Sequence, residues 1–339
     1  MDRAMGLPFT RRQLTIGFLA ILAVALLTLP QLLSQYWVMV MTMTAIAAAL
    51  GYGFRFIMNA GRFTMGHAAF AGIGGYAAAL FTTKVVENFW LGLFMGGIVA
   101  GLVGLFIGAA ILRVPGLMFA IITMAISEIF RYLVIMWRSL TGGITGVLNI
   151  PSPSIAGLDF GIDQVPYFYL IFGILVVSVL VMYRMERSRI GLTFHAIRQN
   201  DPLAQHLGVN IWRYRILCFS VACFFAGLVG AFQSHYWHYV SPATYTVMDS
   251  FTIFIYAYVG GLMYPAGPIV GAAFMVGLSE GLRFSKEIAP LFYGGALVLI
   301  IFFLPGGILS LPQESRALLR QARARWKKMR DRFARAPGS

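Results

Sequence analysis

Charged side chains are scarce in this sequence, because Asp, Glu, Lys and Arg together make up only 11% of its 339 residues. Soluble domains carry about 25% charged residues. A chain with so few cannot cover a large water-facing surface, and 59% of its residues are hydrophobic. Apolar runs near the roughly 20 residues needed to cross a bilayer recur along it. The sequence therefore predicts an integral membrane protein of the all-α class, a polytopic bundle of membrane helices.

Cysteine is almost absent, which excludes a disulfide framework. Cys218 and Cys223 lie in one apolar run, five positions apart and on different faces of a helix. Two small buried apolar side chains are the simplest interpretation. No metal site is predicted either. His235 and His238 flank Trp237 without a local carboxylate or third ligand, which is typical of an aromatic belt at a membrane surface.

Reactive motifs are also missing from the sequence. It contains no HExxH, no Ser/His/Asp grouping within the apolar runs and no paired carboxylates. The phosphate-binding pattern G-x-x-x-x-G-K-[ST] is absent as well. We therefore expect a protein that is not an enzyme, has no cofactor of its own and cannot hold ATP in a P-loop.

Long apolar runs are abundant, and they predict about eight to ten membrane crossings. The candidate spans are 14–33, 36–58, 63–82, 90–112, 116–137, 166–183, 214–238, 248–264, 266–282 and 288–311. The third and the ninth are rich in Gly and Ala, so either could be re-entrant if protein surrounds its broken backbone. Arg11 and Arg12 precede the first run, but no small-x-small cleavage site follows it. We interpret that run as a membrane helix and not as a signal peptide.

The basic residues are distributed unevenly along these spans. With ten crossings and a cytosolic N-terminus, the predicted cytosolic segments and adjoining span ends hold nearly all of the 26 Lys and Arg residues. The exceptions are Lys84, Arg131, Arg138, Arg283 and Lys286. Because cytosolic loops collect Lys and Arg, both termini and the loop 184–213 are predicted to be cytosolic. The chain then divides into a membrane domain, 1–311, and a basic cytosolic tail, 312–339, beside anionic headgroups. The net charge of +14 needs no nucleic-acid partner.

One cytosolic stretch, GLTFHAIRQNDPLAQHLG (191–208), is unusually polar. Asn200 or Asp201 can cap a helix whose first position is Pro202, and Gly208 can end it in the left-handed conformation. The residues expected to share one face of this helix are Leu203, Ala204 and Leu207. Such a helix is small enough to enter a groove on another protein. An ordinary membrane-surface helix that links two spans is the alternative.

This stretch, read as GLTFHAIRQNDPLAQHLGVN (191–210), resembles the coupling loop of bacterial ABC-importer permeases. More narrowly, it is similar to the branched-chain amino acid permease family, in particular to its M-type subunits. Asp201, Ala204 and Gly208 match the acidic–Ala–Gly skeleton of that loop. Pro202 departs from the acidic or apolar residue expected there, but it suits the start of a helix.

Three further segments carry the same resemblance in the expected order. GRFTMGHAAFAGIGGYAAAL (61–80) is similar to the family's Gly-x-hydrophobic-Ser/Thr-x-Gly-His-Ala-Ala-Phe segment. RSLTGGITGVLNIP (138–151) is similar to its Leu-Thr-Gly-Gly-x-x-Gly loop, and GGLMYPAGPIVGAAFMVGLSE (260–280) to its Gly-Pro-x-x-Gly-Ala segment. Together the matches cover roughly 50–310.

The resemblance implies a multi-pass permease of the bacterial inner membrane that carries branched-chain or related hydrophobic amino acids. It implies a homologous second permease, two ABC ATPase subunits that hold ATP and Mg, a periplasmic solute-binding protein and contact with membrane lipids. The residues that would couple the permease to the ATPases are Asp201, Pro202, Leu203, Ala204, Leu207 and Gly208.

Small residues at four-residue spacing make GHAAFAGIGGY a candidate for the transport pathway. Such lines allow membrane helices to pack closely, and that alone could explain them. Alternatively, a broken helix there exposes backbone groups to a zwitterionic substrate. His67 could be a ligand, a pH-sensitive group or a hydrogen-bonded histidine at an interface. The candidate pathway residues are Gly66, His67, Phe70, Gly72, Gly74, Glu128 and Thr145.

Charges inside the spans are few. Glu128 and Arg131 lie three residues apart on one helix face. They could form an internal ion pair, contact substrate or face a partner permease. Asp249, Glu280 and Arg283 lie near predicted span ends, and we expect them at the membrane interface.

Two other kinds of transporter stay open on the sequence alone. One is a related ABC permease for urea or a short amide, which would share the same skeleton. The other is a secondary transporter or channel without ATPase partners. The Gly-rich, possibly repeated segments 61–80 and 260–280 favour the second alternative, and the capped cytosolic helix argues against it.

Overall fold

The computed structural model describes residues 28–283 except 115, 156–157 and 162, together with 294–295, 298, 302 and 306–311. Most of the predicted span 14–33, most of 288–311 and the basic tail lie outside the described residues. Within the described part, helices make up nearly all of the regular structure, as the all-α prediction requires.

Five helices are long and apolar enough to cross a membrane. They are α2 (Gln35–Asn59), α4 (Phe89–Ile111), α5 (Gly116–Met136), α7 (Gln164–Glu186) and α10 (Ile211–Trp237). They confirm five of the predicted spans to within three residues at each end. Asn88 and Asn210 begin α4 and α10 as side-chain caps that accept hydrogen bonds from backbone N–H groups. Of the five, α2 and α10 are the most buried, so they form the centre of the bundle.

The predicted span 63–82 is helical only from its fifth residue. The helix α3 (His67–Lys84) is almost entirely buried, and residues 61–66, which connect it to α2, are not helical. Its Gly and Ala content allows close packing against α10 and α4. A Cβ added at Gly74 would overlap the backbone of Gly227, and one at Gly96 would lie 2.6 Å from the carbonyl oxygen of Gly74. Helix backbones approach this closely only where side chains are absent.

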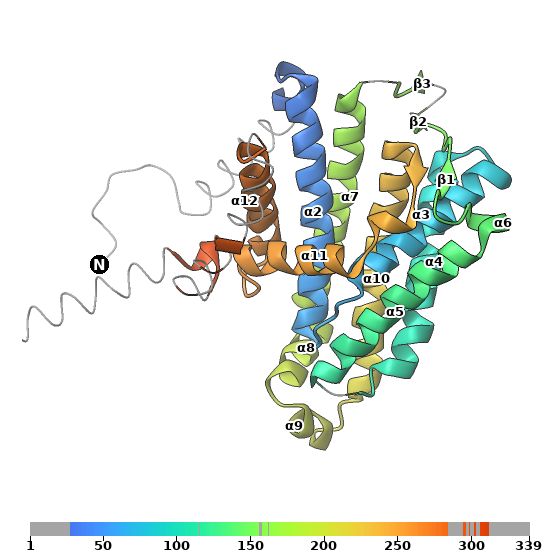
Figure 1. The fold of residues 1–339 in the computed structure, drawn as a ribbon. Coiled ribbons are helices and arrows are strands. Elements are labelled where there is room, and N and C mark those ends of the chain that lie inside the picture. The colour runs from blue at the N-terminus through green and yellow to red at the C-terminus, as the bar shows by residue number, and fades with distance from the viewer. Residues whose placement is uncertain are drawn as a thin grey trace, which may run out of the picture.

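The predicted spans 248–264 and 266–282 do not cross as full membrane helices. The helices found there, α11 (Val247–Gly260) and α12 (Gly267–Gly281), have 14 and 15 residues. At 1.5 Å per residue each is about 21–23 Å long, against a hydrocarbon core of about 30 Å. Figure 1 shows α11 lying across the bundle while α12 stands beside α2. The two helices pack against α2 and against each other, while one face of α12, including Phe274, stays exposed.

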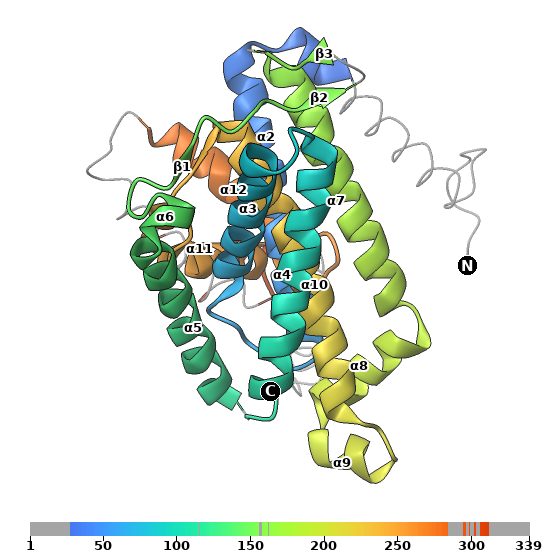
Figure 2. The same ribbon diagram turned by 90° about the vertical axis from the view of Figure 1, so that its right-hand side faces the viewer.

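The short elements lie at the two opposite ends of the bundle (Figures 1 and 2). One end carries α6 (Arg138–Thr141), the antiparallel strands β1 (Val147–Leu148) and β4 (Tyr239–Val240), and the hairpin of β2 (Ser154–Ile155) with β3 (Leu158–Asp159). The other end, which we call the α9 end, carries α8 (Arg189–Gln199) and α9 (Asp201–His206). Two 3-10 turns, η1 (Pro242–Thr244) and η2 (Ile308–Ser310), complete the described elements.

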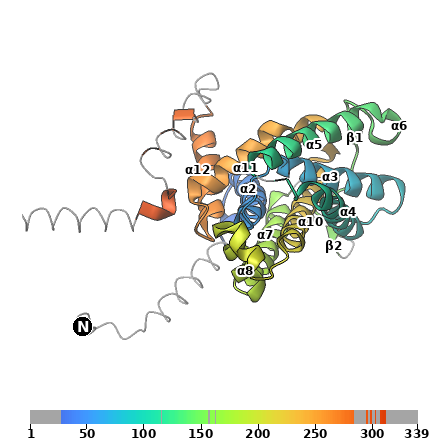
Figure 3. The same ribbon diagram turned by 90° about the horizontal axis from the view of Figure 1, so that it is seen from below.

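The arrangement around α2 determines where a site can form. Seen from below in Figure 3, α2 lies between α12 and α11 on one side and α3, α10 and α4 on the other. It packs extensively against α7, α12, α10 and α11. A space that opens among these helices is therefore lined by side chains from several of them.

The close approach of α3 to α10 makes a prediction about stability. Replacing Gly74 with Ala should lower the free energy of unfolding by about 1–3 kcal/mol, because the new methyl group overlaps the backbone of Gly227. Gly173 in α7 is the matched control, because a Cβ there meets nothing within 4 Å. Gly173→Ala should be neutral or stabilising by up to about 1 kcal/mol. Thermal unfolding in detergent compares the two, and equal stability of both variants would contradict the packing argument.

Candidate functional site

A cavity of about 220 Å³ lies among α2, α3, α10, α11 and α12. Most of its wall is aliphatic. The aliphatic residues that line it include Met43, Ile46, Ala47 and Leu50 of α2, Ala68 and Ala71 of α3, and Ile253 and Val276. A mostly apolar cavity with a few convergent polar groups is the usual form of a small-molecule site.

The polar groups of this cavity come from α10 and from the start of α11. Asp249 lies in the first turn of α11, where one of its carboxylate oxygens accepts hydrogen bonds from the N–H and hydroxyl of Thr246 at 2.8 and 2.6 Å. No cationic side chain pairs with Asp249 among the described residues. Within the same part of the chain, the buried side-chain oxygens of Gln233 and Tyr245 have no hydrogen-bond partner. Asp249 thus brings a carboxylate without a cationic partner to the cavity, and Gln233 and Tyr245 line it with side chains whose unpartnered oxygens are buried.

Three backbone N–H groups at the start of α3 already have partners within the protein. The hydroxyl of Thr123 accepts a hydrogen bond from the N–H of Met65 at 3.0 Å. The hydroxyl of Ser250 accepts one from the N–H of Ala68, also at 3.0 Å. The N–H of Gly66 reaches the hydroxyl of Thr64 at 3.2 Å. The idea that a broken helix exposes its backbone here is therefore not what the geometry shows.

None of the seven predicted pathway residues lines the cavity. Gly66 lies against the Thr123 carbonyl, and Gly74 packs against α10. Gly72 lies behind the cavity wall, because a Cβ there would be 2.9 Å from the ring of Tyr245. This segment contributes Ala68 and Ala71 to the cavity instead.

The other four predicted pathway residues lie elsewhere. His67 is buried edge-on to Phe54, and Phe70 packs edge-on to Phe219. Glu128 forms an ion pair of 2.8 Å with Arg131 on α5, where both side chains are partly exposed. Thr145 is exposed in the turn between α6 and β1, at the end of the molecule opposite α9.

The capped helix predicted in the loop at the α9 end is present. The loop itself is shorter than predicted, because α7 continues to Glu186 and α10 begins at Ile211. The Asn200 side chain caps α9 by accepting a hydrogen bond from the N–H of Leu203 at 3.1 Å. Pro202 occupies the first turn, and Gly208 has the left-handed φ of +82° that favours glycine.

The prediction that Leu203, Ala204 and Leu207 share one face of α9 is wrong for Ala204. Ala204 is only 3% exposed and packs inward against its own chain, whereas Leu203 and Leu207 are 57% and 76% exposed. Asp201, whose side chain is 41% exposed, also contacts its own chain, because its carboxylate lies 2.6 Å from Arg215 of α10. Arg215 in turn donates to the carbonyl of Ala60 at 3.2 Å. Asp201 and Ala204 therefore anchor the helix, and the two leucines are the residues presented outward.

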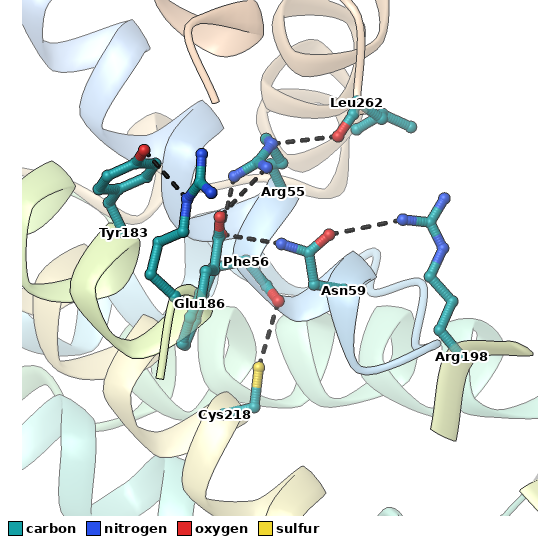
Figure 4. A network of polar contacts seen from close by, with 9 residues as sticks. Arg55, Phe56, Asn59, Tyr183, Glu186, Arg198, Cys218 and Leu262 are labelled. Carbon is teal, nitrogen blue, oxygen red and sulfur yellow. Dashed lines mark hydrogen bonds and ion pairs between the residues drawn. The ribbon is translucent and has the colours of Figure 1, made fainter. Parts of the chain in front are cut away.

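A buried ion pair connects this loop to the membrane helices (Figure 4). Arg55 of α2 and Glu186 of α7 are 2.7 Å apart, with side chains only 4% and 8% exposed. Asn59, one turn beyond Arg55, donates to Glu186 at 2.8 Å and accepts a hydrogen bond from Arg198 of α8 at 3.5 Å. Arg55 also donates to the carbonyl of Leu262, in the corner between α11 and α12, at 3.0 Å. One network thus joins α2, α7, α8 and the short helix pair that closes the cavity.

The two cysteines, His235 and His238 make packing and hydrogen-bond contacts within the bundle. Cys218 and Cys223 are buried and unpaired, as predicted, and the Cys218 thiol donates to the carbonyl of Phe56 at 3.2 Å. His235 packs edge-on to Phe89, and His238 bonds the carbonyl of Ile150. Asp249 was expected at a membrane interface, but it lines the cavity instead.

Comparison with known proteins decides the family. A family model described as branched-chain amino acid transport system / permease component matches residues 13–304. The chain belongs to this permease family. The described helices, the cavity beside α11 and the capped loop helix are therefore parts of a permease.

Individual relatives of the chain are permeases of the same family. The permease is 29% identical over 317 residues to the high-affinity branched-chain amino acid transport system permease protein LivM of Salmonella typhimurium, covering 87% of this chain and 75% of that protein. The LivM protein of Escherichia coli matches with the same identity and coverage. A probable branched-chain amino acid transport permease protein LivH of Methanocaldococcus jannaschii is 29% identical over 133 residues, 38% of this chain and 40% of that protein. No solved structure matches the chain.

The sequence contained signals for the cavity residues, but they were weak. Thr246 and Asp249 have the spacing of a capping box, which predicts the start of α11 without showing what the carboxylate faces. Gln233 is a single amide within an apolar run, and Tyr245 follows a proline-containing turn. Nothing local in the sequence indicates that the three side chains meet.

The Arg55–Glu186 pair makes a prediction about the folded permease. Glu186→Ala should lower the free energy of unfolding by about 3–5 kcal/mol, because it leaves the Arg55 charge buried without a partner. The control is Glu280→Ala, since Glu280 pairs with a mostly exposed Arg283 at 3.2 Å and should cost at most about 1 kcal/mol. Thermal unfolding in detergent, followed by tryptophan fluorescence, measures both. The double variant Arg55→Met with Glu186→Leu should be more stable than Glu186→Ala alone, and a double variant that is equally unstable would count against this explanation.

Proposed function

We propose that this permease is the membrane subunit of an ABC importer and conducts branched-chain or closely related hydrophobic amino acids. The observation that carries the proposal is the cavity beside α11, which combines an aliphatic wall with a carboxylate that has no cationic partner among the described residues. The names of the LivM relatives support the same substrate class.

The chemistry of the cavity fits a zwitterion with an aliphatic side chain. The carboxylate of Asp249 and the amide oxygen of Gln233 accept hydrogen bonds and can hold an ammonium group. The hydroxyl of Tyr245 can donate to the substrate carboxylate. The aliphatic wall, formed in part by Ile46 and Ile253, then contacts the branched side chain. In this assignment the ammonium group, the carboxylate and the side chain of the substrate each have a partner among the lining residues.

The outward face of α9 is proposed as the ATPase contact. Leu203 and Leu207 are large apolar side chains exposed at the tip of a rigidly capped helix. Asp201 and Ala204 hold that helix to α10, so movement of α9 is passed to the bundle. The Arg55–Glu186 network provides a second route, from α8 to the corner at Leu262.

The proposed assembly contains this permease, a homologous second permease, two ABC ATPase subunits and a periplasmic solute-binding protein in the bacterial inner membrane. ATP and Mg are bound by the ATPase subunits, and this chain supplies the pathway without catalysing a reaction. The loop at the α9 end and both termini face the cytosol in this assignment, in agreement with the inside-positive distribution of Lys and Arg.

A second candidate is a permease for urea or a short amide. The amide of Gln233 and the hydroxyl of Tyr245 would suit such a substrate, but a neutral molecule gives the Asp249 charge no counterpart. The two candidate substrates are distinguished by adding leucine or urea as a competitor while the uptake of substrate into reconstituted vesicles is measured. Competition by urea alone would replace the amino-acid assignment. Transport without any ATPase subunit would favour a secondary transporter or channel.

The cavity assignment predicts a selective effect of filling it. Ala47→Leu should reduce leucine uptake at least about ten-fold, because three added carbon atoms occupy the space of the substrate side chain. Ala45→Leu is the control on the same helix, since Ala45 faces a separate apolar groove of about 340 Å³ between α2, α7 and α12. Uptake and ATP hydrolysis are measured with the reconstituted complex. If both variants transport equally well, the cavity beside α11 is not the pathway.

The docking assignment predicts a loss of assembly from one exposed residue. Leu203→Arg should weaken ATPase binding about a hundred-fold or more, because an unpaired guanidinium would be buried at the contact. Ile144→Arg is the control, because Ile144 is a similarly large apolar residue, 71% exposed, that lies at the opposite end of the molecule between α6 and β1. Co-purification of the ATPase subunits is the measurement. Ala204→Arg is less suitable, since Ala204 is buried within its own chain and the variant would test folding. Full co-purification with Leu203→Arg would remove α9 from the contact.

A further inference from the structure

A second and larger cavity lies at the α9 end, outside the proposed pathway. Its volume is about 650 Å³, and it opens where α4 ends and α10 begins, beside α9. Three arginines line it, Arg62, Arg113 and Arg215, together with a single carboxylate, Asp201. The question is what balances their charge.

Asp201 neutralises only one of the arginines. Both of its oxygens lie within 2.6–2.7 Å of the same nitrogen of Arg215. Arg62 and Arg113 have no carboxylate partner among the described residues. The Arg113 guanidinium lies over the ring of Trp212, 5.0 Å from its centroid, which positions the charge at the start of α10. Two cations of this cavity are thus left without an anion.

Arg62 is the more unusual of the two. It is only 5% exposed, and one of its nitrogens donates to the carbonyl of Leu112 at 3.3 Å. Its Nε atom is buried and has no hydrogen-bond partner within the described chain. Burial, and next the neighbouring charge of Arg215, lower the pKa of Arg62, while the nearby Asp201 acts in the opposite direction. The Phe119 ring, 5.9 Å from the guanidinium, is a further partner, and an additional anion would stabilise this buried cation.

Helix ends do not balance the remaining charge. Arg215 and Arg62 each bond a carbonyl at the end of a helix, Ala60 after α2 and Leu112 after α4. A helix C-terminus carries roughly −0.5 of a charge, and the N-terminus of α10 adds roughly +0.5. With three arginines and one carboxylate, the cavity keeps a charge of roughly +1.5.

The surroundings of the cavity indicate where the anion comes from. The outward faces of α4 and of the start of α5 present large exposed apolar side chains next to it, including Phe106, Leu117 and Met118. In a membrane these residues meet acyl chains, and Arg113 follows directly at the level of the headgroups. A lipid could therefore lie along α4 and α5 with its phosphate in the cavity.

We propose that this cavity is a binding site for a phosphate group, and that the ligand is an anionic phospholipid whose headgroup enters between Arg62, Arg113 and Arg215. Phosphate oxygens are strong acceptors for guanidinium N–H groups, and this geometry offers several donors around one space. A free phosphate has the same chemistry, so the experiment below tests it as a separate source. The inference does not depend on which substrate the permease carries.

The test uses the purified full chain, freed of lipid in a non-ionic detergent. Its thermal unfolding is followed while dioctanoyl phosphatidylglycerol, dioctanoyl phosphatidylcholine or inorganic phosphate is added at constant ionic strength. A ligand that binds only the folded state raises Tm with its concentration, which yields a Kd. Phosphatidylglycerol should raise Tm at concentrations where phosphatidylcholine does not.

Variants assign the effect to the cavity. Arg113→Gln should weaken phosphatidylglycerol binding about five-fold or more, the effect of one basic residue near a membrane surface. Arg113→Lys keeps the charge and should recover most of the affinity, which separates charge from packing on Trp212. Arg189→Gln is the matched control, because Arg189 is exposed on α8 outside the cavity. It should bind like the unmodified protein.

The outcomes distinguish the sources. A response to inorganic phosphate that equals the response to phosphatidylglycerol, and that Arg113→Gln weakens, supports the phosphate site and assigns it to a soluble anion. Equal responses to both lipids, or unchanged binding in Arg113→Gln, overturn the proposal. A protein that responds to no phosphate compound but is stabilised by added ATPase subunits also overturns it, because the arginines then serve an acidic protein surface.

Discussion

The buried ion pair between Arg55 and Glu186 is the interaction on which the arrangement of this permease depends. Two charges removed from water are tolerated only when their geometry is good and further hydrogen bonds satisfy them. Here Asn59 and the carbonyl of Leu262 supply those bonds. The requirement brings together the end of α2, the consecutive helices α7 and α8, and the corner of the α11–α12 pair, three parts that are far apart in the sequence. The loop at the α9 end is consequently part of the bundle and not an appendage.

The small residues of α3 explain both its close packing and the cavity beside α11. Gly74, Gly96 and Gly227 let α3, α4 and α10 approach at backbone distance on one side of α3. On its other side, Ala68 and Ala71 face a space that α11 crosses without filling. Because α11 has 14 residues and lies across the bundle, its first turn, with Asp249, is placed inside the protein. A full-length span would have carried that carboxylate to the membrane surface, which is where the sequence led us to expect it.

The two cavities differ in the chemistry of the residues that line them. The one beside α11 is mostly aliphatic and has a single unpaired carboxylate, whereas the one at the α9 end has an excess of arginine. A zwitterion with an aliphatic side chain suits the first, and a phosphate suits the second. Asp201 lines the second cavity and also anchors α9 through Arg215, so the proposed headgroup site and the position of α9 share a residue.

The sequence by itself determined the membrane class, the positions of the five long helices and the capped helix α9. These features depend on hydropathy, on Asn, Pro and Gly at fixed local spacing, and on contacts within a few residues. Only the tertiary structure decided that Ala204 faces inward while Leu203 and Leu207 face outward, and that none of the predicted pathway residues lines the cavity. It also decided that Gln233, Tyr245 and Asp249 meet. The physical reason is that each of these outcomes depends on which helix packs against which face, and such contacts join residues that local sequence cannot relate.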